Sequence, residues 1–389
     1  MPFAPLFAFS FFVHGLLAWR LLPDLQAWGS WMQTGFAGWT LASALLVPLG
    51  LMRMRSLSPR MAQWLTWLGL LCMGLCSSLF ALMVLRELLL ALQATLLWLW
   101  PTAPMVGDWR AWSALAVPLL AMVMSVIGWV NARRTAPVVP VDVPVAKLPQ
   151  ALEGLRIVQI SDIHVGPTIK AGYLERIVKR VNSLNADLVA ITGDLVDGPV
   201  HAIGSWVDSL QQLQSTHGTF FVTGNHEYYS GAQAWIDKLQ SLGITVLMNE
   251  HVVVQHLPLD RALPAASLVV AGVSDYSAHH FDSSHQSDPH KALQGAPQGF
   301  KLLLAHQPRS APAAAQAGFD LQLSGHTHGG QFWPWGHFVR YQQPFTAGLH
   351  RLQQLWVYTS RGTGYWGPPK RFAAPSEITQ LRLVRAGTA

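Results

Sequence analysis

Five clusters of metal-binding side chains follow short apolar runs in the C-terminal part of this 389-residue sequence. In chain order they are Asp162-Ile163-His164, Gly193-Asp194, Gly224-Asn225-His226-Glu227, His306 and Gly325-His326-Thr327-His328. Each cluster alone has an ordinary explanation, such as a turn or a helix cap, but five clusters of one type favour a shared site. Their oxygen and nitrogen donors, without a thiolate, suit Mn, Fe or Zn rather than an iron–sulfur cluster or a structural zinc site.

The spacing and number of these donors indicate two ions. In an extended chain, residues two apart face the same side, so Asp162 converges with His164, and His326 converges with His328. Neighbouring glycines permit close approach of the backbone. The set offers more ligands than one ion needs, and two divalent cations against two aspartates leave a positive site. Such a site favours an anionic substrate such as a phosphate ester.

The clusters stand at the ends of predicted strands. Beyond residue 155, short apolar runs alternate with an amphipathic helical period at 174–184. The runs predict strands at 156–160, 187–192, 219–223, 268–272, 301–305, 321–324 and 355–359. This alternation is typical of an α/β fold, in which ligand sites gather beyond the carboxyl ends of the strands.

The N-terminal part has a different composition. Apolar residues make up 51% of the chain and charged residues only 12%, against about 25% in ordinary globular proteins. Four apolar stretches at 3–19, 35–52, 64–85 and 111–130 have about the 17 to 25 residues that a membrane-spanning helix needs. The first stretch lacks the basic start of a secretory signal, so we expect it to be retained. A fifth stretch, 88–100, is short and is predicted to be interfacial or packed against the bundle.

These patterns predict a protein of two parts, of which the first lies in the lipid bilayer. Residues 1–136 form a transmembrane helical anchor, and residues 137–389 form the catalytic domain. Between 131 and 150 four prolines among valines exclude a helix and favour an extended connector or an edge strand.

The distribution of Lys and Arg predicts the orientation of the anchor. With four spans, one side carries Arg53, Arg55, Arg60, Arg133, Arg134 and Lys147, and the other carries Arg20, Arg86 and Arg110. The more basic side faces the cytoplasm, so we expect the catalytic domain on the cytoplasmic side of the inner (cell) membrane. A fifth span would reverse this orientation.

Other classes of protein are disfavoured by what the sequence contains. Cys72 and Cys76 lie in an apolar run, which excludes a disulfide framework or a thiolate zinc site in the polar part. The Lys and Arg residues form no stripe interleaved with aromatics, so no nucleic-acid partner is expected. The oligomeric state stays open.

The ordered set of motifs resembles the calcineurin-like metallophosphoesterase superfamily. Gly325 to Gln331 (GHTHGGQ) together with Ser360 to Gly364 (SRGTG) is similar to the bacterial membrane-attached branch. The resemblance spans residues 155–383 and implies a four-layer α/β/β/α sandwich. It also implies two divalent transition-metal ions, with Mn preferred over Fe or Zn. Asp162, His164 and His328 would hold one ion, Asn225, His306 and His326 the other, and Asp194 would bridge them.

The same resemblance assigns His226 a catalytic role. This histidine would donate a proton to the leaving oxygen or stabilise it, as an imidazole can near neutral pH. Glu227 is a candidate for orienting His226 or is a surface residue, and Asp197 is expected in a turn or behind the ligands rather than on a metal.

The leading hypothesis is a membrane-anchored dimetal phosphohydrolase. Its substrate would be a phosphomonoester, phosphodiester or pyrophosphate, including esters of a lipid or a lipid-linked nucleotide. The alternative is a non-enzymatic metal-binding membrane sensor or transport component, although Asn225 and His226 are both present. A dimetal amidohydrolase is disfavoured because such an enzyme carries His-x-His on its first strand. Here the first strand is followed by Asp-x-His, and His-x-His follows a later strand.

Two further patterns lie near the C-terminal end of the sequence. Residues 362–367 match the dinucleotide motif GxGxxG, but Pro368 and Pro369 exclude the helix that this motif requires. We expect a glycine-rich loop near the metals, with Arg361 close to phosphate. The aromatic residues Trp333, Trp335, Tyr365 and Trp366 either line a substrate groove, meet the membrane surface or pack in the interior.

Overall fold

The computed structural model describes residues 3–52, 58–102, 108–257 and 264–386. Its contacts divide the chain into two compact units. The first unit consists of Met1–Asn131 and Gly367–Phe372, and the second of Ala132–Trp366 and Ala373–Ala389. Arg53 and Arg55, two of the residues behind the predicted orientation, lie outside the described residues.

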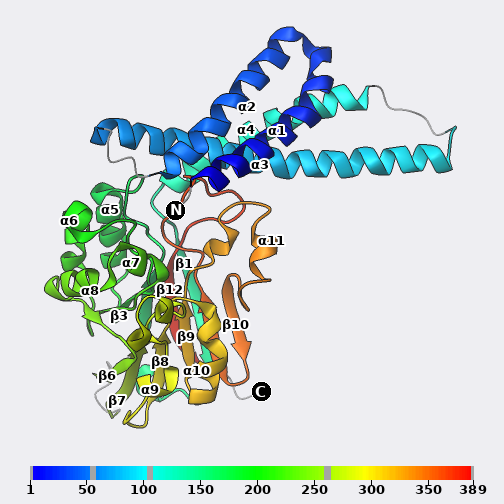
Figure 1. The fold of residues 1–389 in the computed structure, drawn as a ribbon. Helices are drawn as coiled ribbons and strands as arrows, with labels where there is room; N and C mark the ends of the chain where they lie inside the picture. Colours follow the sequence, from blue (N-terminus) through cyan, green and yellow to red (C-terminus); the bar gives the residue numbers. More distant parts are fainter. Residues whose placement is uncertain (1–2, 53–57, 103–107, 258–263, 387–389) are drawn as a thin grey trace. The chain divides into compact units, whose positions relative to one another are not determined.

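Four long helices make up most of the first unit, namely α1 (Ala4–Leu25), α2 (Ser30–Leu51), α3 (Pro59–Leu99) and α4 (Trp109–Arg133) (Figure 1). Within the described residues, these four are long and apolar enough to cross a membrane. The predicted short stretch 88–100 is not a separate element, because it continues α3, which has 41 residues. No Pro or Gly interrupts the chain between Gly74 and Leu99, and Leu, Arg and Glu are good helix formers.

A segment distant in sequence completes this unit. Lys370 is buried, and its Nζ donates to the Gly74 carbonyl (3.0 Å) and to Oγ of Ser78 (2.5 Å) and Ser125 (2.9 Å). The backbone N–H of Arg371 donates to the Gly128 carbonyl on α4 (2.8 Å). Gly367–Phe372 is therefore held between α3 and α4, which the sequence patterns did not predict.

Two six-stranded mixed sheets form the second unit. The order of the first sheet is β1-β12-β2-β3-β4-β5, and that of the second is β10-β11-β9-β8-β7-β6. The strands of the first sheet are β1 (Val138–Val145), β12 (Ile378–Arg385), β2 (Arg156–Ile160), β3 (Leu188–Ile191), β4 (Thr219–Phe221) and β5 (Thr245–Val246). Those of the second are β10 (Gly348–Leu352), β11 (Leu355–Thr359), β9 (Leu321–Ser324), β8 (Phe300–Leu304), β7 (Ala266–Gly272) and β6 (Glu250–His256).

Shorter helices complete the second unit. They are α5 (Ala171–Asn182), α6 (Val200–Ile203), α7 (Asn225–Ser230), α8 (Ala232–Ser241), α9 (Pro289–Ala292), α10 (Ala311–Ala317) and α11 (Gly336–Val339).

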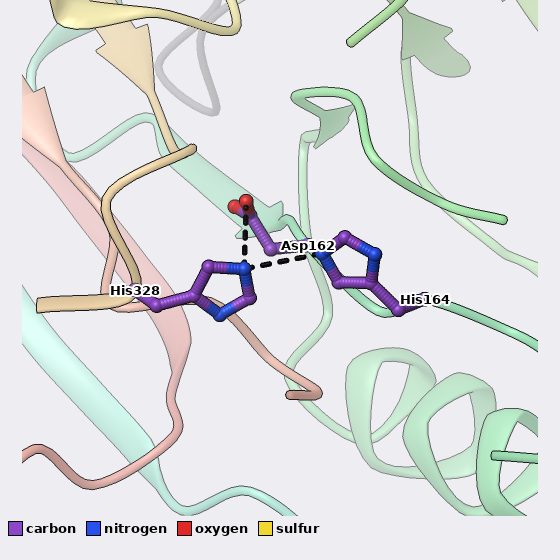
Figure 2. A group of neighbouring side chains, drawn as sticks. All are labelled: Asp162, His164 and His328. Atoms are coloured by element: carbon purple, nitrogen blue, oxygen red, sulfur yellow. Dashed lines mark hydrogen bonds and ion pairs between the residues drawn. The ribbon is translucent and has the colours of Figure 1, made fainter. Parts of the chain in front are cut away.

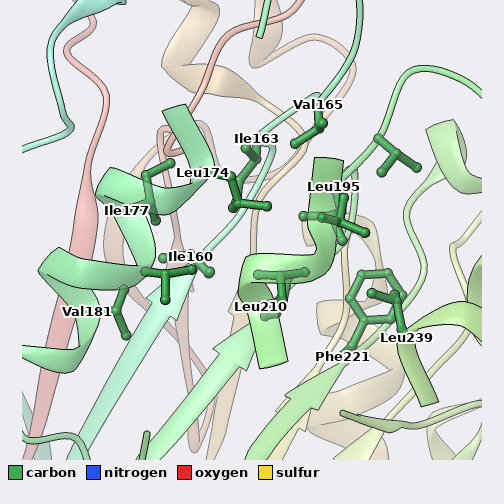
Figure 3. Close-up of a cluster of buried hydrophobic side chains, with 14 of the residues drawn as sticks. Ile160, Ile163, Val165, Leu174, Ile177, Val181, Leu195, Leu210, Phe221 and Leu239 are labelled. Carbon is green, nitrogen blue, oxygen red and sulfur yellow. The ribbon is translucent and has the colours of Figure 1, made fainter. Parts of the chain in front are cut away.

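Three buried clusters hold the layers of this unit together. One joins α5 and α8 to the first sheet and includes Ile160, Leu174 and Phe221 (Figure 3). A second lies between the sheets and includes Leu188 and Leu302, and a third packs α10 on the second sheet. Alternate side chains of a strand face opposite layers, as Leu302 and Leu303 do, so both faces of each sheet are apolar. The predicted α/β/β/α sandwich preceded by four apolar helices is confirmed.

The proline-rich connector forms an edge strand, as its composition indicated. α4 continues to Arg133, a little beyond the start of the stretch predicted to lack helix. β1 then pairs in parallel with β12 alone, at the edge of the first sheet. Pro140 and Pro144 are tolerated there because a strand at an edge needs hydrogen-bond donors on one side only.

Candidate metal centre

The carboxyl ends of five strands bring the clusters together. β2 precedes Asp162 and His164, β3 precedes Asp194, and β4 precedes Asn225 and His226 at the start of α7. These three strands are parallel neighbours in one sheet. In the other sheet, parallel neighbours β8 and β9 precede His306 and the pair His326 and His328. Ends of parallel strands share one edge of a sheet, so all eight side chains lie at the same end of the sandwich.

One group consists of Asp162, His164 and His328. Figure 2 shows the three side chains pointing toward one another. Nε2 of His164 lies 3.1 Å from Nε2 of His328, which is 3.5 Å from Oδ1 of Asp162. All three residues are buried.

A second group consists of Asp194, His306 and His326. Nε2 of His306 lies 3.2 Å from Oδ2 of Asp194 and 3.2 Å from Nδ1 of His326. The same Oδ2 is 3.8 Å from Nε2 of His164. Asp194 therefore stands between the two groups.

The donor set fits cations. Asp162 and Asp194 are both almost fully buried, and no Lys or Arg pairs with either carboxylate in the part of the chain that the structure describes. Oδ1 of Asn225, at the start of α7, is buried and accepts no hydrogen bond from a described residue. Buried carboxylates are costly unless they are paired with a cation or coordinate a metal, and a buried amide oxygen without a hydrogen-bond donor adds to that cost. The seven expected ligands are thus compatible with two divalent ions.

Burial and mutual charge perturb the titration of the group strongly. Burial raises the pKa of Asp162. Burial also opposes ionisation of Asp194, but the imidazole of His306 outweighs it and holds the pKa of Asp194 well below its usual range. Burial and the neighbouring His306 lower the pKa of His326 to about 3. His326 is therefore neutral near pH 7, whereas burial of His306 is outweighed by Asp194, which raises the pKa of His306 well above its usual range.

Three glycines make room for the ligands of neighbouring strands. A Cβ on Gly224 would lie 2.2 Å from Oδ1 of Asp194, and one on Gly325 would lie 2.1 Å from Oδ2 of Asp162. A Cβ on Gly193 would lie 2.8 Å from Nδ1 of His306. The glycine in each motif is therefore required by packing against a ligand from another strand.

The backbone at the ligands differs from the extended chain that the spacing suggested. φ is +52° at Asp162, +57° at His164, +50° at Asp194, +70° at His326 and +51° at His328. Asp162 and His164 come together through left-handed turns after the strand has ended, whereas His326 and His328 lie in different groups, so an extended chain is not what brings these ligands together. Such conformations cost about 1 to 3 kcal/mol for non-glycine residues and cluster at functional sites.

His226 lies at the edge of the two groups and is oriented by Asp197. Nδ1 of His226 lies 2.5 Å from Oδ1 of Asp197, which is also 3.2 Å from Nδ1 of His164. Nε2 of His226 therefore faces the site, 4.0 Å from Oδ2 of Asp194. Burial alone would lower the pKa of His226, but the hydrogen bond with Asp197 and the charges of Asp194 and Asp197 raise it to about 9.

Glu227 does not orient His226, contrary to one expectation, and it is not a surface residue. It is fully buried and accepts hydrogen bonds from the backbone N–H groups of Gly224 (2.6 Å), Asp194 (3.0 Å) and Leu195 (2.8 Å). It therefore ties the end of β3 to the start of α7. The only sequence feature that pointed to a role for Asp197 at the site was its position three residues after Asp194.

The glycine-rich segment 362–367 is a loop, as predicted. Its backbone lies against the first cluster, because Thr363 N–H donates to the Ser161 carbonyl (2.7 Å) and Gly364 N–H donates to the Asp162 carbonyl (3.1 Å). Arg361 pairs with the buried Glu377 at 2.8 Å.

Comparisons with known proteins agree with this fold and site. The family model for the calcineurin-like phosphoesterases matches residues 155–330. An uncharacterized metallophosphoesterase of Aquifex aeolicus is 30% identical over 244 residues, covering 62% of this chain and 89% of that protein. The chain belongs to the calcineurin-like phosphoesterases.

Some relatives are named as transmembrane proteins. The Danio rerio "transmembrane protein with metallophosphoesterase domain" is 41% identical over 274 residues, which is 69% of this chain and 62% of that protein. The chain thus covers less than two thirds of the length of this relative. Among solved structures, the calcineurin-like phosphoesterase YfkN from Bacillus subtilis aligns with a TM-score of 0.40 and 14% identity over 55% of this chain and 82% of that chain. Because the relatives include both a vertebrate and a bacterial protein, membership of a bacterial branch stays a prediction.

Proposed function

We propose that this chain is a membrane-anchored, metal-dependent phosphoric ester hydrolase. The observation that carries the proposal is the meeting of two buried ligand groups at Asp194, with His226 at their edge. The names of the relatives support a phosphoester as the substrate.

In this proposal Asp162, His164 and His328 hold one divalent ion. Asn225, His306 and His326 hold the other, and Asp194 binds both. A pair of such ions supplies an activated water and neutralises the phosphoryl oxygens. The carboxylate, amide and imidazole donors suit Mn, Fe or Zn, and of these we propose Mn.

His226 supplies the proton that the leaving group needs. In the hydrolysis, a bond forms between the water oxygen and phosphorus, the bond from phosphorus to the leaving oxygen breaks, and that oxygen takes up a proton. Nε2 of His226 is the donor atom because Asp197 fixes Nδ1 on the far side of the ring. The hydrogen bond of Nδ1 with Asp197 and the nearby carboxylate of Asp194 favour the protonated imidazole, the form that a general acid needs.

The substrate and location follow from the anchor. We propose phosphomonoesters, phosphodiesters or pyrophosphates, including those of a lipid or lipid-linked nucleotide, because the chain has four helices long and apolar enough to cross a membrane. The proposed location is the inner (cell) membrane with the site in the cytoplasm. A metal-binding sensor or transport component without hydrolytic activity is the competing function.

The full-length chain in detergent, loaded with Mn, Fe or Zn, tests the proposal against a panel of mono-, di- and pyrophosphate esters. His226→Gln should keep its metals and slow hydrolysis by about 10² to 10⁴-fold, the usual contribution of general acid catalysis. Asp197→Asn should slow it less, since Asp197 acts through His226. The loss should be smaller for nitrophenyl esters, which need little proton donation. Metal binding without turnover of any ester would favour the sensor.

A further inference from the structure

Two exposed aromatic rings lie beside the proposed proton donor, and a third lies against one of them. The ring of Tyr229 on α7 lies 5.2 Å from that of His226, and the ring of Trp366 lies 5.6 Å from it. The ring of Phe281 is 5.5 Å from that of Tyr229. Tyr229 is 62% exposed, Phe281 52% and Trp366 49%. Apolar rings of this size are normally covered, so a cluster of them beside a reactive group marks a binding surface.

Trp366 is held in place by a residue next to the metal ligands. Nε2 of Gln331 donates to the Trp366 carbonyl (2.8 Å), and the Trp366 N–H donates to Oε1 of Gln331 (2.8 Å). Gln331 is buried, has φ +60° and follows His328 by three residues. The backbone that carries the exposed ring is therefore fixed relative to the site.

A leaving group at His226 would lie beside two of these rings. A leaving oxygen within hydrogen-bond reach of Nε2 of His226 lies about 2.6 to 3.2 Å from it. The group attached to that oxygen then lies near Tyr229 and Trp366, whose ring centroids are 5.2 Å and 5.6 Å from that of the imidazole.

We propose that Tyr229, Phe281 and Trp366 form a stacking platform for the leaving group, and that this group carries a planar aromatic or heterocyclic ring. The proposal rests on the proposed hydrolase function and narrows its substrate class. Aromatic side chains bind planar rings face to face or edge to face, in a way that is tolerant of the ring's identity.

An acyl chain fits these residues less well. The exposed aliphatic side chains in the described part of this unit, Val252, Val253 and Leu257, lie on β6 or directly after it. Those beside His226 are aromatic instead. No Lys or Arg is placed over the rings of Tyr229, Phe281 or Trp366 within the described residues, so the platform suits a neutral ring rather than a second anionic group.

Two esters with the same type of leaving oxygen test the platform. Benzyl and cyclohexylmethyl phosphate esters both release a primary alcohol of similar size, but only the benzyl group is planar. Full-length enzyme should prefer the benzyl ester in kcat/KM by about tenfold, the contribution expected of one stacked ring. Trp366→Leu should bring the ratio close to one, mainly through KM, whereas Trp366→Phe should preserve it.

A matched control and a binding measurement complete the experiment. Tyr341→Leu changes an exposed aromatic residue of the same unit that contacts Arg340, and it should leave the ratio unchanged. Binding of benzylphosphonate and cyclohexylmethylphosphonate, which are not hydrolysed, is measured by calorimetry on the same variants. Equal binding of both phosphonates to the unmodified protein, or a preference for an alkyl chain retained in Trp366→Leu, would overturn the platform. Failure to hydrolyse either ester while the phosphonate preference holds would instead count against the hydrolase function.

Discussion

Asp194 is the side chain on which both groups of proposed ligands depend. Its Oδ2 lies 3.2 Å from Nε2 of His306 and 3.8 Å from Nε2 of His164, which belong to different groups. Its Oδ1 also accepts the backbone N–H of His226 (2.9 Å), so the carboxylate fixes the start of α7 as well. A change here reaches the two metals and the proton donor together.

Asp194→Asn should therefore weaken the binding of both proposed metal ions. The amide keeps the size of the side chain but removes the negative charge that two cations share. Metal analysis of the purified full-length chain should show fewer ions per chain than the unmodified protein, with loss from both sites. Asp208→Asn is a suitable control, because Asp208 pairs with Lys238 at the surface (2.6 Å). Unchanged occupancy in Asp194→Asn would show that Asp194 is no bridge.

Gly224→Ala should displace Asp194 without changing any ligand. The added Cβ would lie 2.2 Å from Oδ1 and 2.5 Å from the backbone N of Asp194, closer than real side chains approach. Metal content and turnover should fall together while the fold survives. Gly172→Ala is the matched control, since nothing lies within 4 Å of its added Cβ. Normal metal content in Gly224→Ala would mean that the strand ends can separate to admit a methyl group.

At the scale of single elements, buried strands were predictable because they are continuous apolar runs. The bounds of β2, β9 and β11 agree with the predicted ranges, and each strand is mostly buried. β12 was not predicted, because its polar residues Thr379, Gln380 and Arg382 interrupt the apolar run. It forms by pairing with β1 and β2, which lie far away in the sequence.

The candidate site was predictable in its residue types but not in its local geometry. The order of aspartates, asparagine and histidines after apolar runs identified which side chains to consider. The pairing of Asp197 with both His164 and His226 joins residues that follow three different strands. No spacing along the chain encodes that contact, or the hold of Gln331 on Trp366.

The segment Gly367–Phe372 should lose its place in the helical unit when Gly128 is enlarged. A Cβ on Gly128 would lie 2.6 Å from Cγ of Lys370 and 3.4 Å from the backbone N of Arg371. Lys370 and Arg371 are buried, so trypsin should cut slowly after them in the unmodified chain and rapidly in Gly128→Leu. Gly35→Leu, with open space around its added Cβ, should stay resistant. Slow cleavage in Gly128→Leu would mean that the segment is held by contacts other than those with α4.

At the scale of the whole molecule, four membrane spans would return the chain to the side on which it began. α3 has 41 residues, or about 60 Å at 1.5 Å per residue, twice the hydrocarbon thickness of about 30 Å. Arg86 lies inside α3, is buried, and pairs with Asp24 and Glu87. It is therefore not a loop charge, and the basic excess on the side of Arg60, Arg133, Arg134 and Lys147 is larger than the loop count assumed.

This distribution of charge predicts that the site faces the cytoplasm, since basic loops are retained there. Single cysteines are introduced after Cys72 and Cys76 have been replaced, and intact cells are treated with an impermeant maleimide. Ser241→Cys, at the exposed end of α8, should react only after the cells are permeabilised. Thr102→Cys, which follows α3 on the opposite side of the fourth span, should react in intact cells. The reverse pattern would place the site outside the cell, where a lipid or nucleotide ester of the cytoplasm could not be its substrate.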